Sequence, residues 1–254
     1  MIWLFQSRTS MIKRLTIFCI FAAVAVTVSG NRVVRRDAPG GSFTLTDIAG
    51  LKFWYQGDSY NGTTGTATDL SGNANDATQG TSGSRPTHVA NEQNGNDVMR
   101  LDGSNDFLDI TTPVALTSFT FGISFKVNPT YVVQAIISGG NGAPELRIKS
   151  SEVLAAEKSL NAELAAGSTD VVDATWHTVI VTYDGTVCTI YLDGVSDGTA
   201  SNAQTFLANV SLIGKNSAND WFAGDIMDVA AYDSVLSGGN LTNFQTFLAT
   251  RAGL

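Results

Sequence analysis

The sequence holds few cysteines, and several common catalytic motifs are missing from it. It has two cysteines in 254 residues, Cys19 in an apolar N-terminal run and Cys188 in a strand-like segment. If the N-terminal run is removed, Cys188 stands alone, so no intrachain disulfide holds the body of the chain together. We therefore expect Cys188 to be a small buried apolar residue. Nucleophile-elbow, phosphate-loop and metalloprotease motifs are absent from the sequence.

Basic residues are scarce beyond the first 36 positions. That segment carries six Lys and Arg and no acidic residue, which leaves nine basic and 23 acidic residues, a net charge of −14, in the rest of the chain. A body this acidic does not attract nucleic-acid phosphates through its overall field. The charge suits a soluble extracellular protein, and it suits acidic loops that collect calcium.

The N-terminal region has the features of a targeting segment. An apolar run, Leu15–Val28, follows Lys13 and Arg14 and ends among small residues. This order is typical of a signal peptide, so we interpret residues 1–30 as a leader and residues 31–45 as a linker, with a secreted or cell-surface product. The run is shorter than the ~20 residues that span a bilayer. Three arginines directly after it disfavour export, so an uncleaved membrane anchor and an arm buried in an assembly stay open.

Two segments, Asp69–Asp76 and Leu101–Phe107, crowd Gly, Asn, Asp and Ser beside apolar stretches. Gly reaches positive φ without strain, and Asn and Asp close turns onto their own backbone, so both segments predict turns. Their side-chain oxygens are also the donors that calcium prefers. The pattern indicates a β protein whose function lies in its loops.

Alternating apolar residues predict the strands. In Phe119–Val127 every second residue is apolar, which places five such side chains on one buried face, with the other face wet or under loops. Trp176–Tyr183 and Val187–Leu192 flank Asp184-Gly185, a strong hairpin signal. About ten such short strands predict a single antiparallel sandwich. The spacing of Leu and Phe in Gly239–Thr250 predicts a short helix.

Seven motifs follow one another in a recognisable order: Gly50-Leu-Lys-Phe-Trp54, Asp69–Asp76, Leu101–Phe107, Trp176-His177, Thr182-Tyr-Asp-Gly185, Tyr191-Leu-Asp-Gly194 and Gly224-Asp-Ile-Met-Asp-Val229. In this order they resemble the laminin-G-like, concanavalin A-like domains of bacterial surface and phage proteins, over residues 46–254. The resemblance implies an all-β fold, an antiparallel jelly-roll β-sandwich with a short C-terminal helix. It also implies paired strands in Ser151–Ala166, where Ala, Glu and Leu favour helix, and we follow the topology.

Calcium is the predicted cofactor. The candidate ligands in the first loop are Asp69, Asn73, Asn75 and Asp76. The resemblance adds Asp225 and Asp228, because related domains often join an early loop to this late strand through calcium. The segment Asp102–Asp106 is a second candidate loop. The alternative for both loops is a network of Asx turns without metal.

A glycan is the predicted ligand, with a surface protein as the alternative partner. Sugar binding needs an exposed aromatic face beside polar side chains, and Trp221 follows a polar loop. The predicted ligand-binding residues are Asn216, Asn219, Asp220 and Trp221. Tyr131 is the other aromatic residue near a polar loop. Trp54 and Trp176 lie in strand patterns and are expected in the core, whereas Trp221 fits either position.

No catalytic residue is predicted. Glycosidases on the implied fold carry closely spaced Glu and Asp on one strand, and the five glutamates here form no such motif: Glu92, Glu145, Glu152, Glu157 and Glu163. His177 is interpreted as a half-buried structural residue. The sequence therefore predicts a non-catalytic binding module for carbohydrate recognition or adhesion. The alternatives are a structural, decoration or fibre protein of a phage particle, with virion assembly or homo-oligomers, and an unrecognised hydrolase.

Overall fold

The computed structural model describes residues 27–28, 33–34, 43–129, 133–158 and 162–254. The chain divides into two units, Met1–Ser42 and Phe43–Leu254. In the first, strand β1 (Thr27–Val28) pairs antiparallel with β2 (Val33–Val34). The rest of the predicted leader, Cys19 included, lies outside the described residues. Within the described residues no helix is long and apolar enough to cross a membrane.

The second unit begins at Phe43, inside the predicted linker. Leu45 starts the short 3-10 helix η1 (Leu45–Asp47) and is fully buried. It packs with Ile48 and Trp54 in an apolar cluster that also holds the C-terminal helix. The sandwich domain therefore extends a few residues further toward the N-terminus than its motifs predict.

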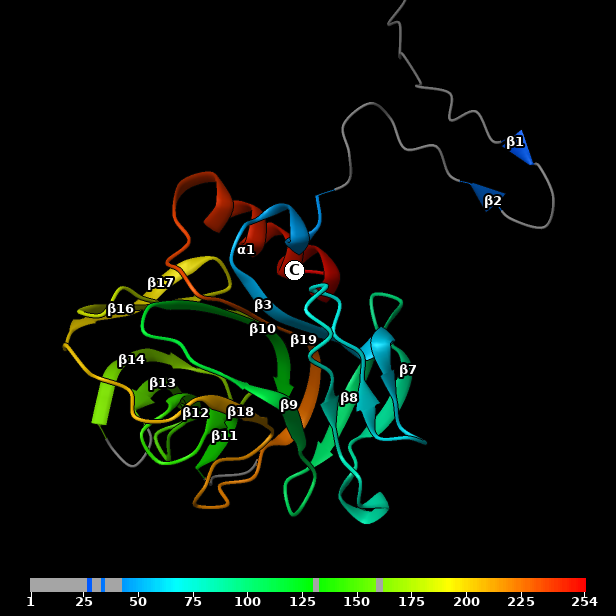
Figure 1. The fold of residues 1–254 in the computed structure, drawn as a ribbon, viewed down its shortest axis with the longest axis horizontal. Helices are drawn as coiled ribbons and strands as arrows, with labels where there is room; N and C mark the ends of the chain where they lie inside the picture. The colour runs from blue at the N-terminus through cyan, green and yellow to red at the C-terminus, as the bar shows by residue number, and fades with distance from the viewer. Residues whose placement is uncertain (1–26, 29–32, 35–42, 130–132, 159–161) are drawn as a thin grey trace, which may run out of the picture. The chain divides into compact units, whose positions relative to one another are not determined.

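Two antiparallel sheets form the body of this unit (Figure 1). In sheet I the strand order is β17 (Val195–Ser201), β16 (Val187–Leu192), β15 (Trp176–Tyr183), β10 (Phe119–Val127), β19 (Ala223–Tyr232), β8 (Asn96–Asp102) and β7 (Thr87–Gln93), and β3 (Leu51–Gln56) also pairs with β19. In sheet II it is β14 (Ala162–Asp170), β13 (Val153–Lys158), β12 (Pro144–Ile148), β11 (Gln134–Gly139), β18 (Val210–Ile213), β9 (Leu108–Val114), β6 (Ala77–Thr78), β5 (Thr66–Ala67) and β4 (Tyr60–Asn61). This arrangement confirms the predicted all-β sandwich.

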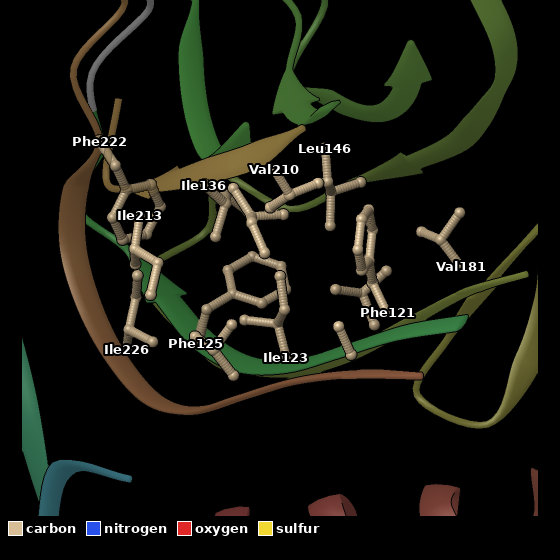
Figure 2. Packing of buried hydrophobic residues seen from close by; sticks show 14 of the residues in the cluster. Phe121, Ile123, Phe125, Ile136, Leu146, Val181, Val210, Ile213, Phe222 and Ile226 are labelled. Atoms are coloured by element: carbon tan, nitrogen blue, oxygen red, sulfur yellow. The ribbon is translucent and has the colours of Figure 1, made fainter. Parts of the chain in front are cut away.

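The core lies between the two sheets. Phe121, Ile123 and Phe125 of β10 point toward apolar side chains of sheet II, among them Leu146 and Val210 (Figure 2). All five apolar residues of the alternating segment are buried, as predicted. Burying each such side chain contributes about 1.5–3 kcal/mol, so β10 is a central contributor to the stability of the sandwich.

Much of the other face of β10 is buried as well, and helix α1 (Gly238–Ala252) covers part of it (Figure 1). Gly122 lies under Phe244, and a Cβ atom at this position would come within 2.1 Å of the Phe244 Cζ. Thr120 accepts a hydrogen bond from the Leu236 backbone N–H at 2.9 Å and donates one to the Ser234 carbonyl at 2.8 Å. The face predicted to be wet or under loops therefore carries a glycine where the helix covers it, whereas Lys126 on the same face is half-buried and contacts Glu92 and Asp225.

The segment with helical propensity forms strands β13 and β14, as the topology predicted. Cross-strand pairing and the burial of Leu154 and Leu164 in the main core outweigh the propensity of single residues. Strands β7 and β17 were not predicted. Their residues are mostly polar and exposed, so neither shows the alternation that marks a half-buried strand.

Candidate functional site

Asp69 organises the first predicted calcium loop through hydrogen bonds to its own neighbourhood. Its Oδ1 accepts the backbone N–H groups of Trp54 and Ser71 at 3.0 and 2.9 Å. Its Oδ2 accepts the N–H of Asn75 at 3.0 Å and the Ser71 hydroxyl at 2.8 Å. Asp76 in turn accepts the Asp69 N–H at 2.9 Å. The Asp69 carboxylate thus already has two donors on each oxygen.

The two asparagines of this loop form hydrogen bonds to strands β3 and β9. Asn73 donates to the carbonyls of Leu51 and Lys52 at 2.9 and 3.1 Å. Asn75 accepts the Thr112 N–H at 2.7 Å and donates to the Thr112 carbonyl at 2.9 Å. These contacts join β3 to β9, so the loop works as a hydrogen-bonded connector between the sheets.

Asp225 of β19 lies between two bases. Its register partners are Arg100 on β8 and Lys126 on β10. Arg100 binds the carboxylate in a bidentate manner at 2.6 and 3.0 Å, and Lys126 lies 3.0 Å from it. Glu92 contacts both bases at 2.9 and 3.0 Å. The four charges balance, and the Asp225 side chain is held in an ion-pair network.

Asp228 lies away from the Asp69 loop. It is fully buried and binds Arg251 of α1 and the Gln56 amide, both at 3.0 Å. Burial raises its pKa, while the Arg251 charge opposes the rise. Trp54 directs its N–H to Asp69 and its carbonyl to Leu70, so β3 lies between the loop and β19.

The predicted ligand set therefore does not fit a calcium ion. Asp69 is saturated by N–H and O–H donors, and Asp225 and Asp228 are paired with bases on the far side of β3. No group of three or more His, Cys, Asp or Glu side chains in the described residues could hold a metal. The geometry fits the Asx-turn alternative, and calcium binding stays a prediction.

The second candidate loop is an Asx turn with an unusual acid beside it. Asp102 Oδ1 accepts the N–H groups of Ser104, Asn105 and Asp106 at 2.8, 3.0 and 3.3 Å. Asp106 is 7% exposed, and its Oδ2 accepts the Asp102 N–H at 3.2 Å. Burial, and then the nearby Asp102 charge, raise the pKa of Asp106 to about 6.

Trp221 lies in a surface cluster that we call the rim patch: Phe107, Lys215 and Trp221. The two rings have centroids 5.9 Å apart. The Lys215 ammonium lies 3.9 Å from the Phe107 centroid and 4.8 Å from the Trp221 centroid. All three residues are half-buried. The patch lies outside the apolar core clusters, unlike Trp54 and Trp176, which are buried as predicted.

The polar residues predicted to accompany Trp221 have different positions. Asn216 is buried, and its amide donates to Glu145 and Asp220 at 2.9 and 2.8 Å while its oxygen accepts two backbone N–H groups. It therefore shapes the loop and has no group left for a ligand. Asn219 is exposed at a φ of 64°, and Asp220 is half-buried. These two and Trp221 remain available at the surface.

Three of the five glutamates form a row across sheet II, which sequence reasoning missed. Glu145, Glu157 and Glu163 are register partners on β12, β13 and β14. Glu157 pairs with Arg147 at 3.1 Å and Glu163 with Lys149 at 2.7 Å. Burial raises the pKa of Glu145, whose side chain lies under the Asn216 loop with Oε2 unpartnered. No sequence signal marks this row, because its members come from three strands.

His177 and His88 both contact carboxylates. His177 is buried, and its ring lies 2.8 Å from Asp193 and 3.2 Å from Asp173. Burial alone lowers its pKa, but the hydrogen bond and charge of Asp193, and then of Asp173, outweigh burial and raise it. These contacts between His177 and the two carboxylates lie at the end of a hairpin and fit a structural role. His88 lies 2.8 Å from Asp97.

The sequence was also compared with known proteins. The model of one protein family, described as the concanavalin A-like lectin/glucanases superfamily, matches residues 102–241, which is more than half of the chain. The chain belongs to this superfamily. Among curated proteins, no sequence match was found. The superfamily assignment agrees with the two antiparallel sheets and the C-terminal helix.

Solved structures share this lectin/glucanase fold. A Trypanosoma rangeli sialidase in complex with 2,3-difluoro-KDN superposes with a TM-score of 0.58 at 17% identity over 90% of this chain, which covers 37% of the sialidase. Domain 4 of AbnA, a GH43 extracellular arabinanase from Geobacillus stearothermophilus in complex with arabinotriose, gives 0.58 and 16% over 77% of this chain and 98% of that domain. The binding domain of botulinum neurotoxin DC in complex with SialylT gives 0.55 and 14% over 82% and 52%. At these identities the likeness shows the fold alone, and this chain spans about a third of the sialidase.

Proposed function

We propose that this lectin/glucanase-superfamily chain is a non-catalytic carbohydrate-binding module, and that the rim patch is its sugar platform. The observation that carries the proposal is the position of Trp221 beside Phe107 at the surface, outside the core, with the Lys215 ammonium over both rings. Aromatic faces beside a few fixed polar groups are the usual lining of small-ligand sites. Asn219 and Asp220 supply polar groups next to the rings.

Two structural neighbours lend support, because the arabinanase domain and the neurotoxin binding domain were solved with saccharides bound. A patch at a sandwich rim buries little of its ligand, so the affinity of one site is low. Firm adhesion then needs several copies on one surface. This use fits an extracellular or cell-surface location, which the N-terminal segment favours.

The glutamate row does not alter the proposal. Glycoside hydrolysis needs a protonated carboxyl group and a carboxylate that both reach the scissile bond. Glu145, the member of the row whose pKa is raised, is 1% exposed and bonded to Asn216 beneath a loop. Glu157 and Glu163 are paired with bases. We therefore propose binding without bond cleavage.

The test is a glycan array followed by titration of the best ligand. Trp221→Ala and Phe107→Ala should each abolish measurable binding and leave the melting temperature nearly unchanged. Tyr191→Ala, which removes a half-buried aromatic ring near α1, is the matched control and should bind as the wild type does. Unfolding of Trp221→Ala would reject the platform, and release of reducing sugar from polysaccharide would reject the non-catalytic assignment.

The location has its own test. Mass spectrometry of the exported protein should find a new N-terminus between Ala25 and Asp37. Recovery of intact Met1 or Met11 from the extracellular fraction would contradict a cleaved leader.

A further inference from the structure

A second recess, whose lining shares no residue with the rim patch, lies between the edge strands of the two sheets. It has a volume of about 800 Å³ and opens to solvent. Its walls are the segment Asp58–Thr63, which contains edge strand β4 of sheet II, and the segment Arg85–His88 leading into edge strand β7 of sheet I, with Ser82 of η3 (Ser82–Ser84) completing it. Hydroxyl, amide and backbone groups dominate this lining. We call this recess the edge groove.

Arg85 is fixed in the wall of the edge groove by backbone carbonyls. Its Nε donates to the Gln79 carbonyl at 2.9 Å, one terminal nitrogen donates to Gly80 at 3.0 Å, and the other donates to Thr63. Gly65 makes room for this side chain, since a Cβ atom there would lie 2.6 Å from Arg85 Nε. The guanidinium is therefore pre-positioned and has little rotational freedom to lose when it binds a ligand.

The charge of Arg85 has no acidic partner among the described residues. In the described part of the chain no Asp or Glu forms an ion pair with it, although acids outnumber bases in the body of the protein. Asp58, the acidic residue in the lining of the groove, forms an ion pair with Arg251 of α1. A guanidinium has five N–H donors, and carbonyls use three of them here. One N–H on each terminal nitrogen is left.

The rest of the lining is suited to a hydroxylated ligand. Asn61, Ser82 and Thr87 are exposed and border the recess with amide and hydroxyl groups. The His88 ring lies beside them, held by Asp97 at 2.8 Å. Such groups bond sugar hydroxyls, whereas a carboxylate suits the two free N–H groups of a fixed guanidinium. The volume lies within the range of small-ligand sites.

From these features we infer that the edge groove binds an acidic saccharide, with the sugar carboxylate on Arg85 and the ring hydroxyls on the polar walls. This site goes beyond the rim patch and does not depend on it. Trp221→Ala should leave it intact, so failure of one site is distinguishable from failure of the other.

The experiment is calorimetric titration of the full chain with trigalacturonate, its methyl ester and inorganic sulfate. We expect trigalacturonate to bind, its affinity to fall as salt rises, and the ester and sulfate to bind at least tenfold more weakly. Replacing Arg85 itself frees three carbonyls and disturbs folding, so the variant is Ser82→Asp, which adds one negative charge at an exposed position of the groove wall. It should weaken binding about fivefold.

Ser82→Asn is the matched neutral control and should bind trigalacturonate as the wild type does. The inference is overturned if the ester binds as well as the acid, or if Ser82→Asp and Ser82→Asn have equal affinities. It is also overturned if sulfate alone binds as tightly as the saccharide, because the sugar would then add nothing.

Discussion

Replacing Asp106 with Asn should stabilise the protein at neutral pH. Asp106 is 7% exposed, and its pKa is about 6 against an ordinary value of 3.8, so its folded environment favours the protonated carboxyl group. Asn mimics that neutral form, and its oxygen can still accept the Asp102 N–H, now 3.2 Å from Asp106. The substitution therefore removes a buried charge and keeps the hydrogen bond.

The magnitude follows from the two pKa values. For an acid whose pKa rises on folding, the stabilising contribution is complete below pH 3.8 and is lost as the pH rises through about 6. Each factor of ten in proton affinity is 1.36 kcal/mol, so the wild type loses about 3 kcal/mol across this window. The amide of the variant does not titrate. The variant should be about 3 kcal/mol more stable at pH 7, which corresponds to roughly 6–12 °C in melting temperature for a domain of this size.

The assay is a series of calorimetric melts from pH 3.5 to 7.5. The curves for wild type and Asp106→Asn should coincide at low pH and separate as the pH approaches 7. Asp102→Asn is the control of opposite sign: burial acts to raise the pKa of Asp102, but three backbone N–H bonds outweigh it and lower the pKa, so this variant should be destabilised at pH 7. A lower melting temperature for Asp106→Asn at pH 7, or an effect independent of pH, would refute the reasoning.

Three further outcomes are expected. His177→Gln should be most destabilising in urea titrations below pH 6.5, because the ion pairs with Asp173 and Asp193 need the charged ring. The loss of stability relative to the wild type should shrink as the pH rises through the raised pKa of His177. A loss that stays constant from pH 5 to 9 would count against these ion pairs. A chelator should leave the melting temperature unchanged, since the Asp69 oxygens are already satisfied. A drop of several degrees that calcium reverses would instead support the calcium prediction. Gly122→Ala should lower the free energy of unfolding by about 1–3 kcal/mol in chemical denaturation, because its Cβ meets the Phe244 ring. Adding Phe244→Leu should recover part of this loss. An unchanged denaturation midpoint for Gly122→Ala would show that α1 can shift away.

Strands with a strong apolar alternation were predictable from the sequence. The segment Phe119–Val127 matches β10 residue for residue, because burial between the sheets demands an apolar side chain at every second position. Strand β7 was not predicted because it is an exposed edge strand with a polar sequence. The helix was found because Phe244 and Leu248 share its buried face.

The partners of charged residues were not predictable. Asp225 was proposed as a metal ligand, but strand register places Arg100 and Lys126 opposite it. Bulges in several ladders shift the register and leave no trace in a single sequence. For the same reason the row that begins at Glu145 stayed hidden, and Trp221 could not be assigned to core or surface until the fold was known.

Strand β19 has a consequence for the order in which the protein is assembled. It pairs with β10 on one side and with β3 and β8 on the other. These three strands are synthesised earlier, and they cannot pair with β19 until Ala223–Tyr232 has been made. Contacts between residues this far apart in the chain form slowly. A growing chain therefore has unpaired hydrogen-bonding edges on β3 and β10 until β19 has been made. This delay keeps the chain incompletely folded for longer, and it makes chaperone binding before β19 is complete a measurable step.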